Sequence, residues 1–160
     1  MRVRVAEPGD LPDAGRVTVA AYRADGSVKD GDSYLEALGD AERRARAAEL
    51  YVAVEDGRVL GTVTYCPPVG ELSELAAPDE GEFRFLAVAP AVQGRGVGRA
   101  LVERCLDRAR EERRTAVVLC SLPTMTSAHR LYGRLGFRRT PDRDWSPVDG
   151  VDLWAFRLDL

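Results

Sequence analysis

Three glycines at alternating positions are the residues of this chain whose type and spacing most clearly serve chemistry. Gly94, Gly96 and Gly98 follow an apolar run that ends at Pro90, and an amphipathic pattern begins directly after them. A strand, a glycine loop and a helix in that order bring free backbone N–H groups and the positive end of a helix dipole together. Because glycine has no Cβ, a ligand can approach this backbone closely. The segment therefore predicts a binding site for a phosphate group.

The spacing of the glycines distinguishes between the common types of phosphate-binding loop. A dinucleotide fingerprint needs a glycine where this chain has Arg99, and it belongs to the first strand and helix of a domain. A nucleoside-triphosphate loop needs a lysine, and this loop has none. What remains is Gln93-x-x-Gly96-x-Gly98 after the run Phe85-Leu86-Ala87-Val88. This pattern resembles the acyl-CoA pyrophosphate loop of the GNAT superfamily of acyl-CoA-dependent N-acyltransferases. The alternative is an ordinary glycine-rich turn that caps a helix.

A second motif lies downstream, in the order that the same superfamily shows. Ala128-x-x-Leu131-Tyr132-x-x-Leu135-Gly136-Phe137 resembles the fourth-helix signature of that superfamily, and two ordered motifs are more specific than one. The resemblance covers residues 82–138 well, and residues 1–65 and 145–158 only as a compatible pattern of elements. It implies an N-acetyltransferase that moves an acetyl group from acetyl-CoA to a primary amine by direct attack in a ternary complex. The acceptor is then a small-molecule or protein amine.

The resemblance also implies roles for individual residues. Tyr132 is expected to protonate the departing CoA sulfur as general acid, and the backbone N–H of Val88 to bind the thioester carbonyl oxygen. Glu82, at the start of the strand that leads to the glycine loop, is the candidate general base. The alternatives are core packing for Tyr132 and a solvated glutamate for Glu82. Asp79 and Glu80 are competing carboxylates.

Acetyl-CoA is expected to be held mainly by backbone amides, with two arginines set against its phosphates. The cofactor-binding set is Leu86, Ala87, Val88, Gln93, Gly94, Arg95, Gly96, Val97, Gly98 and Arg99. One position departs from the superfamily pattern, since Met125 stands where many members carry an asparagine that contacts the pantetheine arm. No metal is expected, because His129 is the single histidine and the cysteines are not at ligand spacings.

The acceptor site is less well defined by the sequence. Residues 71–82 contain five carboxylates and no basic residue, so this segment could attract a cationic amine; a plain solvated loop is the alternative. Asp144 and Trp145 are further candidates for the acceptor pocket. A route through an acylated Cys120 is disfavoured, because apolar surroundings raise the pKa of a thiol. His129 is expected on an exposed helix face.

The composition is that of a soluble globular protein, and one domain over residues 1–160 is expected. A net charge of −3 gives no general affinity for nucleic acid or for an anionic membrane, so neither partner is expected. The start has no long apolar segment, and the three cysteines are widely spaced, which favours reduced thiols in the cytoplasm. The superfamily resemblance makes a homodimer plausible. A non-catalytic acyl-CoA-binding module of the same fold is the competing function.

The hydrophobic pattern predicts the elements that position these residues. Strands are expected at 2–5, 50–54, 59–65, 82–89, 115–120, 137–139 and 151–158, and helices at 11–24, 33–49, 97–110 and 124–135. Asp56-Gly57 predicts a tight hairpin between the second and third strands, Gly136 suits the cap of the last helix, and residues 141–147 are expected to connect the last two strands. The helix at 33–49 has a weak apolar stripe and is expected on the surface. On strand 82–89, alternation puts Phe83, Phe85 and Ala87 on one face. The resemblance implies an α/β (α+β) fold, a mixed and splayed sheet of about seven strands with about four helices on both faces.

Overall fold

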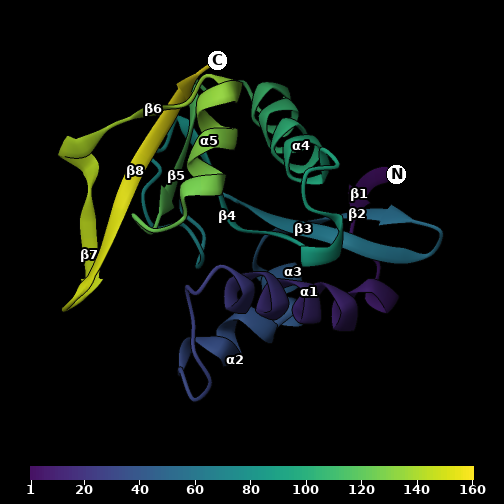
Figure 1. Ribbon diagram of the computed structural model, residues 1–160. Helices are drawn as coiled ribbons and strands as arrows, with labels where there is room; N and C mark the ends of the chain where they lie inside the picture. Colours follow the sequence, from purple (N-terminus) through teal and green to yellow (C-terminus); the bar gives the residue numbers. More distant parts are fainter.

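The computed structural model describes residues 1–160, and its elements follow the chain in the predicted order (Figure 1). The strands are β1 (Arg2–Val5), β2 (Glu49–Glu55), β3 (Arg58–Cys66), β4 (Glu80–Val88), β5 (Ala116–Ser121), β6 (Arg138–Arg139), β7 (Trp145–Val148) and β8 (Val151–Asp159). The helices are α1 (Leu11–Ala24), α2 (Tyr34–Gly39), α3 (Ala41–Ala47), α4 (Val97–Glu111) and α5 (Thr126–Leu135). The predicted fold class is confirmed, with eight strands and five helices in place of about seven and four.

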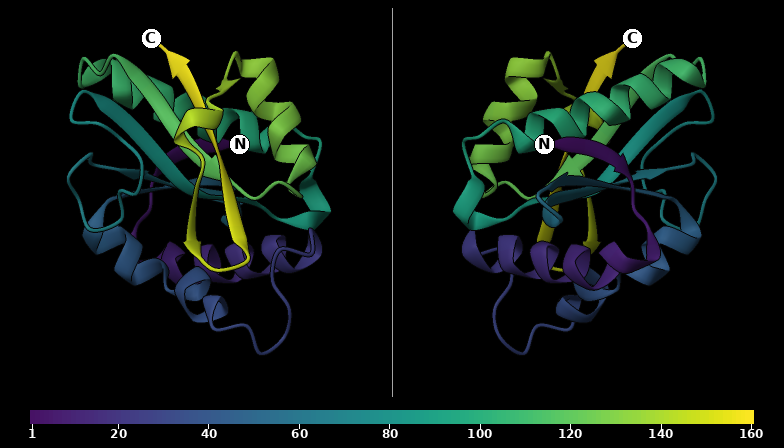
Figure 2. Two further views of the ribbon diagram at one scale, coloured as in Figure 1. Left: turned by 90° about the vertical axis from the view of Figure 1, so that its left-hand side faces the viewer. Right: turned by 90° about the vertical axis from the view of Figure 1, so that its right-hand side faces the viewer.

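One mixed sheet organises the molecule. Its strand order is β1-β2-β3-β4-β5-β8-β6, with β7 paired to β8, and only β4 and β5 are parallel. Helices α4 and α5 cover one face of the sheet, and α1, α2 and α3 cover the other (Figures 1 and 2). The turn between β2 and β3 is the predicted tight hairpin, because Asp56 and Gly57 both take positive φ, 49° and 74°.

The predicted helix at 33–49 is wrong in two respects. The chain forms two helices that meet at Asp40, whose φ of −82° and ψ of 72° break the helical path. The Asp40 side chain accepts a hydrogen bond of 2.9 Å from the backbone N–H of Arg43 and so caps α3. The segment is also not confined to the surface, since Leu38 and Arg44 are buried.

The eighth strand lies in a segment that the sequence reading treated as a connection. Strand β7 pairs with β8 through Trp145 opposite Leu153 and Val148 opposite Val151. The turn between them contains Gly150 at a φ of 82°. An Asp-Gly step again lies between two β-rich runs, but here only the glycine takes a positive φ, whereas both Asp56 and Gly57 do so between β2 and β3.

The sheet is splayed between β4 and β5, as predicted. These strands pair only from Glu80–Glu82 to Ala116–Val118. Beyond that point β4 continues to Val88 without a partner on this edge, while β5 stays paired with β8 along its whole length. The result is a wedge whose edge on β4 carries free backbone groups.

A β-bulge in β4 changes which side chains face which layer. Two residues of β4 stand opposite one residue of β3, and Phe85 takes a φ of 56°. The predicted alternation is therefore wrong beyond Arg84, because Phe83 packs into the core with Leu86 and Val88 while Phe85 packs with Val28 and others on the α1–α2 face. Positive φ is rare for a bulky residue, and strain of this kind gathers at functional sites.

Candidate functional site

A groove of about 700 Å³ lies between the open end of β4, the glycine loop, α4, α5 and the last turns of α1. Most of the predicted cofactor-binding set lines it. These residues are Leu86, Ala87, Val88, Gln93, Gly94, Gly96, Val97, Gly98 and Arg99. Arg95 does not, since its guanidinium turns to a separate hollow and pairs with Glu55 at 2.8 Å. Cofactor binding by these residues stays a prediction.

The glycine loop has the geometry that an anion requires. Gly94 and Gly96 take φ values of 81° and 82°, and a Cβ at either position would meet no atom within 4 Å. The first turn of α4 closes with a bond of 3.0 Å from the N–H of Ala100 to the carbonyl of Gly96. The N–H groups of Val97, Gly98 and Arg99 precede that bond and have no acceptor in the helix. The loop and helix start thus present free N–H donors of the kind that bind a phosphate group.

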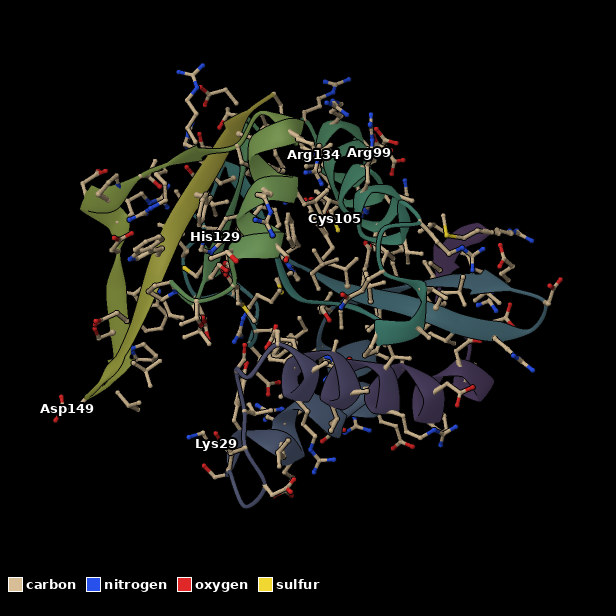
Figure 3. The ribbon with its side chains drawn as sticks, viewed as in Figure 1. Lys29, Arg99, Cys105, His129, Arg134 and Asp149 are labelled. Carbon is tan, nitrogen blue, oxygen red and sulfur yellow. The ribbon has the colours of Figure 1, made fainter.

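Positive charge along the groove comes from two helices. Arg99 on α4 and Arg134 on α5 both line it and lie close together in Figure 3, and Arg130 lines it one turn before Arg134. Sequence reasoning named Arg99 but missed both α5 arginines. Their four-residue spacing on the second motif's helix is the signal that could have found them.

The wedge exposes a backbone donor at the end of β4. The N–H of Ala89 donates to the carbonyl of Leu60 in β3 at 2.8 Å. Because successive N–H groups of a strand point to opposite edges, the N–H of Val88 points away from β3 and into the wedge. Val88 also lines the groove. A carbonyl oxygen in the groove therefore has a backbone donor within its lining.

Tyr132 lies in the core beside the groove and is not part of the groove's lining. Its side chain is 5% exposed and packs against the rings of Phe83, Phe137 and Phe156. Burial raises the pKa of Tyr132, and the nearby Cys105 adds to the effect. The phenol is thus protonated at neutral pH, as a general acid must be. Its catalytic role stays a prediction.

Glu82 is fully buried at the start of the wedge and does not line the groove. Its carboxylate accepts a hydrogen bond of 2.9 Å from the hydroxyl of Ser73. It also accepts bonds of 3.0 to 3.1 Å from the backbone N–H groups of Glu74, Leu75 and Ala76. These contacts tie the loop between β3 and β4 to the sheet. They leave the carboxylate few free positions for a substrate proton, and its role as base stays a prediction.

The acidic segment at 71–82 is balanced by arginines from other elements. Three of its carboxylates form ion pairs. The pairs are Glu71 with Arg43, Glu74 with Arg84, and Glu80 with both Arg143 and Arg157. Asp144 is likewise paired with Arg139 at 2.7 Å, and the indole N–H of Trp145 donates to the sulfur of Cys120 at 3.3 Å. The segment therefore has less free negative charge than its sequence indicated.

His129 is not on an exposed face, so that expectation is wrong. Its ring packs 5.6 Å from that of Trp154 and 5.0 Å from that of Phe156, and Nε2 lies 3.0 Å from the hydroxyl of Ser121 (Figure 3). Burial lowers the pKa of His129. Burial also raises the pKa of Cys120 to about 11, so this thiol is protonated at neutral pH. All three cysteines are free.

The model of the acetyltransferase (GNAT) family matches residues 18–137. A mycothiol acetyltransferase from Cellulomonas flavigena is 31% identical over 151 residues, which are 89% of this chain and 39% of that protein. The N-alpha-acetyltransferase RimI from Mycobacterium tuberculosis is 34% identical over 111 residues, which are 68% of this chain and 65% of that protein. The first relatives are thus more than twice as long as the part that the chain spans.

Solved structures share the fold over almost the whole chain. A GNAT-family acetyltransferase from Brucella melitensis, in complex with acetyl-CoA, is 27% identical and has a TM-score of 0.62. The match covers 99% of this chain and 90% of that one. None of the helices is long and apolar enough to cross a membrane.

Proposed function

The chain belongs to the acetyltransferase (GNAT) family, and on that premise we propose that it transfers an acetyl group from acetyl-CoA to a primary amine. The proposal rests on one observation above all. An open glycine loop, the free N–H groups of α4 and the unpaired edge of β4 line a single groove. The relatives' names, and the acetyl-CoA in the structure from Brucella melitensis, support this choice of donor.

Different residues of the groove bind different parts of acetyl-CoA. Bound acetyl-CoA supplies an activated thioester. The backbone N–H groups of Val97, Gly98 and Arg99 bind its pyrophosphate at the start of α4. The side chains of Arg130 and Arg134 add positive charge to this end of the groove. Arg99 lines it as well, although its guanidinium also pairs with Glu103 at 2.7 Å. Arg95 contributes only through the backbone of the loop, because its side chain is held by Glu55.

Acetyl transfer moves one acyl group and two protons. A primary amine has a pKa near ~10, so only about one molecule in a thousand is uncharged at neutral pH, and a carboxylate that takes its proton raises this fraction. The amine nitrogen then bonds to the carbonyl carbon, and the N–H of Val88 stabilises the negative oxygen. The carbon–sulfur bond breaks and Tyr132 donates its proton to the sulfur. The second proton leaves the nitrogen as the amide forms and restores the Tyr132 phenol. Glu82 is the base that the sequence predicted, and of its two oxygens Oε1 accepts the fewer hydrogen bonds, one of 3.2 Å from the N–H of Glu74.

The acceptor is a small-molecule or protein amine, as the names of the relatives suggest. The test is a panel of both kinds, in which thiol release from acetyl-CoA is followed together with the mass of the acceptor. We expect thiol release that depends on the acceptor, and a product heavier by one acetyl group. Tight binding of acetyl-CoA without product from any amine would refute the proposal and favour a non-catalytic binding module.

A further inference from the structure

An ion pair lies at the bulge of β4, on the face of the sheet that carries α1 and α2. Arg84 and Glu74 meet with Nη2 and Oε1 2.6 Å apart, and their side chains are 18% and 25% exposed. The guanidinium of Arg84 also donates from Nη1 to the carbonyl of Leu72 at 2.9 Å, and it stacks 4.6 Å from the centre of the Phe85 ring. The pair is therefore firmly placed, yet open to solvent.

This pair is connected to the groove by a wall of aromatic rings. Tyr22 lines the groove, and its ring lies 6.5 Å from that of Tyr34, which in turn stacks 6.4 Å from Phe85. The pKa of Tyr22 is raised by burial and by the nearby phenols of Tyr34 and Tyr132, while Arg84 opposes the rise. Tyr22 thus lies near both the proposed acid and Arg84 of the ion pair. An acceptor that contacts Arg84 would pass along this wall to reach the groove.

The charged side chains beside this wall differ in how many of their hydrogen-bonding positions are already occupied by protein groups. Arg44 is 2% exposed and has no carboxylate partner, since it donates only to the carbonyls of Ala37 and Leu38 and to the hydroxyl of Thr18. Its guanidinium lies 5.0 Å from the centre of the Phe85 ring and adds positive charge under the wall. It is enclosed, and no ligand can replace its contacts.

Arg84 and Glu74, in contrast to Arg44, retain free hydrogen-bonding positions toward solvent. Arg84 has N–H donors beyond the two that it uses, and the Oε2 atom of Glu74 accepts no hydrogen bond. A ligand that satisfies both groups at once must carry a carboxylate for the guanidinium and an ammonium for the carboxylate. A free amino acid carries these two groups on one carbon.

We propose that Arg84 and Glu74 bind a free amino acid as the acceptor, with its carboxylate on Arg84 and its amino group on Glu74. This proposal rests on the acetyl transfer described above. Glu74 then takes the proton that the ammonium group must lose before the nitrogen attacks the thioester. Glu82 is a positioning residue for this step, because its carboxylate accepts the backbone N–H of Glu74.

The surroundings of Glu74 suit a proton acceptor. Burial raises the pKa of Glu74, Arg84 lowers it, and the charge of Glu82 raises it, so that it lies above the usual carboxyl value. A raised pKa makes this carboxylate a better proton acceptor than an ordinary glutamate. Glu80, by comparison, is held by two arginines, which lower its pKa although burial opposes them.

The test measures kcat and KM for free amino acids and for their amides, which keep the amine but lose the carboxylate. The proteins are the wild type, Arg84→Met and Glu74→Gln. Arg43→Met and Glu71→Gln are matched controls, because Arg43 and Glu71 also meet at 2.6 Å but are 53% and 59% exposed. We expect the wild type to prefer acids over amides by at least about tenfold in kcat/KM, since an unpaired guanidinium penalises the amide. Arg84→Met should abolish the preference through KM. Glu74→Gln should lower kcat at least about tenfold and remove the acidic limb of the pH profile.

Several outcomes would overturn the proposal. One is that the wild type uses amino acids and their amides equally well. Another is that the preference for the acid remains in Arg84→Met, or is lost to the same extent in Arg43→Met. An acidic limb that survives Glu74→Gln but disappears in Glu82→Gln would assign the base to Glu82 instead. Stabilisation by acetyl-CoA should persist in every variant, which shows that each is folded. If that stabilisation is absent from the wild type, the proposed function itself fails.

Discussion

Replacement of Tyr132 by phenylalanine removes one hydroxyl and leaves the ring in place. The ring centre lies 6.0 Å from that of Phe83, 5.9 Å from Phe137 and 5.7 Å from Phe156, and the residue is 5% exposed. Because phenylalanine fills the same space, we expect the free energy of unfolding to change by less than about 1 kcal/mol. The variant thus separates the chemistry of the hydroxyl from packing.

The expected loss of rate follows from the role of general acid. Such a group contributes about 10²- to 10⁴-fold, which is about 2.7 to 5.4 kcal/mol of barrier. Water is a poor replacement, since the surroundings of Tyr132 are aromatic and buried. We therefore expect kcat for Tyr132→Phe to fall at least about a hundredfold, with the KM for acetyl-CoA within about threefold of wild type. Thiol release at saturating acetyl-CoA and acceptor measures both constants.

A retained kcat would show that the Tyr132 hydroxyl is not the general acid. If Tyr132→Phe retains kcat within about threefold of the wild type, the hydroxyl donates no proton in the step that limits the rate. Tyr132 would then be a core residue only. Tyr132→Ala is the matching control for packing, because loss of the whole ring should cost about 3 to 5 kcal/mol of stability.

Three further predictions concern stability. Gly15→Ala should lower the free energy of unfolding by about 1 to 3 kcal/mol in chemical denaturation, because its Cβ would lie 2.3 Å from the carbonyl oxygen of Gly39. The control is Gly133→Ala, also in a helix but with open space around it, which should be neutral or stabilising. The pKa of His129 is lowered by burial, so the folded state binds fewer protons than the unfolded state; stability should fall as the pH drops from about 7 to about 5, and His129→Gln should flatten this slope. Glu80→Gln should lower the free energy of unfolding by about 1 to 3 kcal/mol, because Arg143 loses its carboxylate partner and Arg157 keeps only the exposed Asp159; an unchanged melting temperature would contradict this.

The sequence predicted the elements where local chemistry alone determines them. The hairpin at Asp56 and Gly57, the helix after Gly96 and the left-handed cap at Gly136 each depend on residues that are neighbours in the chain. The same kind of signal was present for two features that were missed. Asp40 caps α3, and Gly150 allows the turn before β8. A closer reading of Asp and Gly positions would have found both.

Other features depend on contacts that the sequence does not display. The bulge at Phe85 has no glycine to mark it, although Phe85 takes a positive φ. Its ring packs against Arg84 and against residues of α1 and α2 that are distant in the sequence. The partner of Arg84 is Glu74, and nothing in the spacing distinguishes that carboxylate from Glu82 as an accessible acid. The difference between them is burial, which appears only when the loop folds over the sheet.

Thermal unfolding with acetyl-CoA, CoA and ATP tests the central claim, that the glycine loop binds an acyl-CoA, most directly. The proteins are the wild type, Gly96→Glu and Gly57→Glu; both glycines have positive φ and open surroundings, so both substitutions carry similar backbone strain. A ligand at a hundred times its Kd stabilises the native state by about 2.7 kcal/mol. We predict stabilisation by acetyl-CoA and CoA but not by ATP in the wild type and Gly57→Glu, and none in Gly96→Glu. No stabilisation of the wild type by either CoA species would contradict the account.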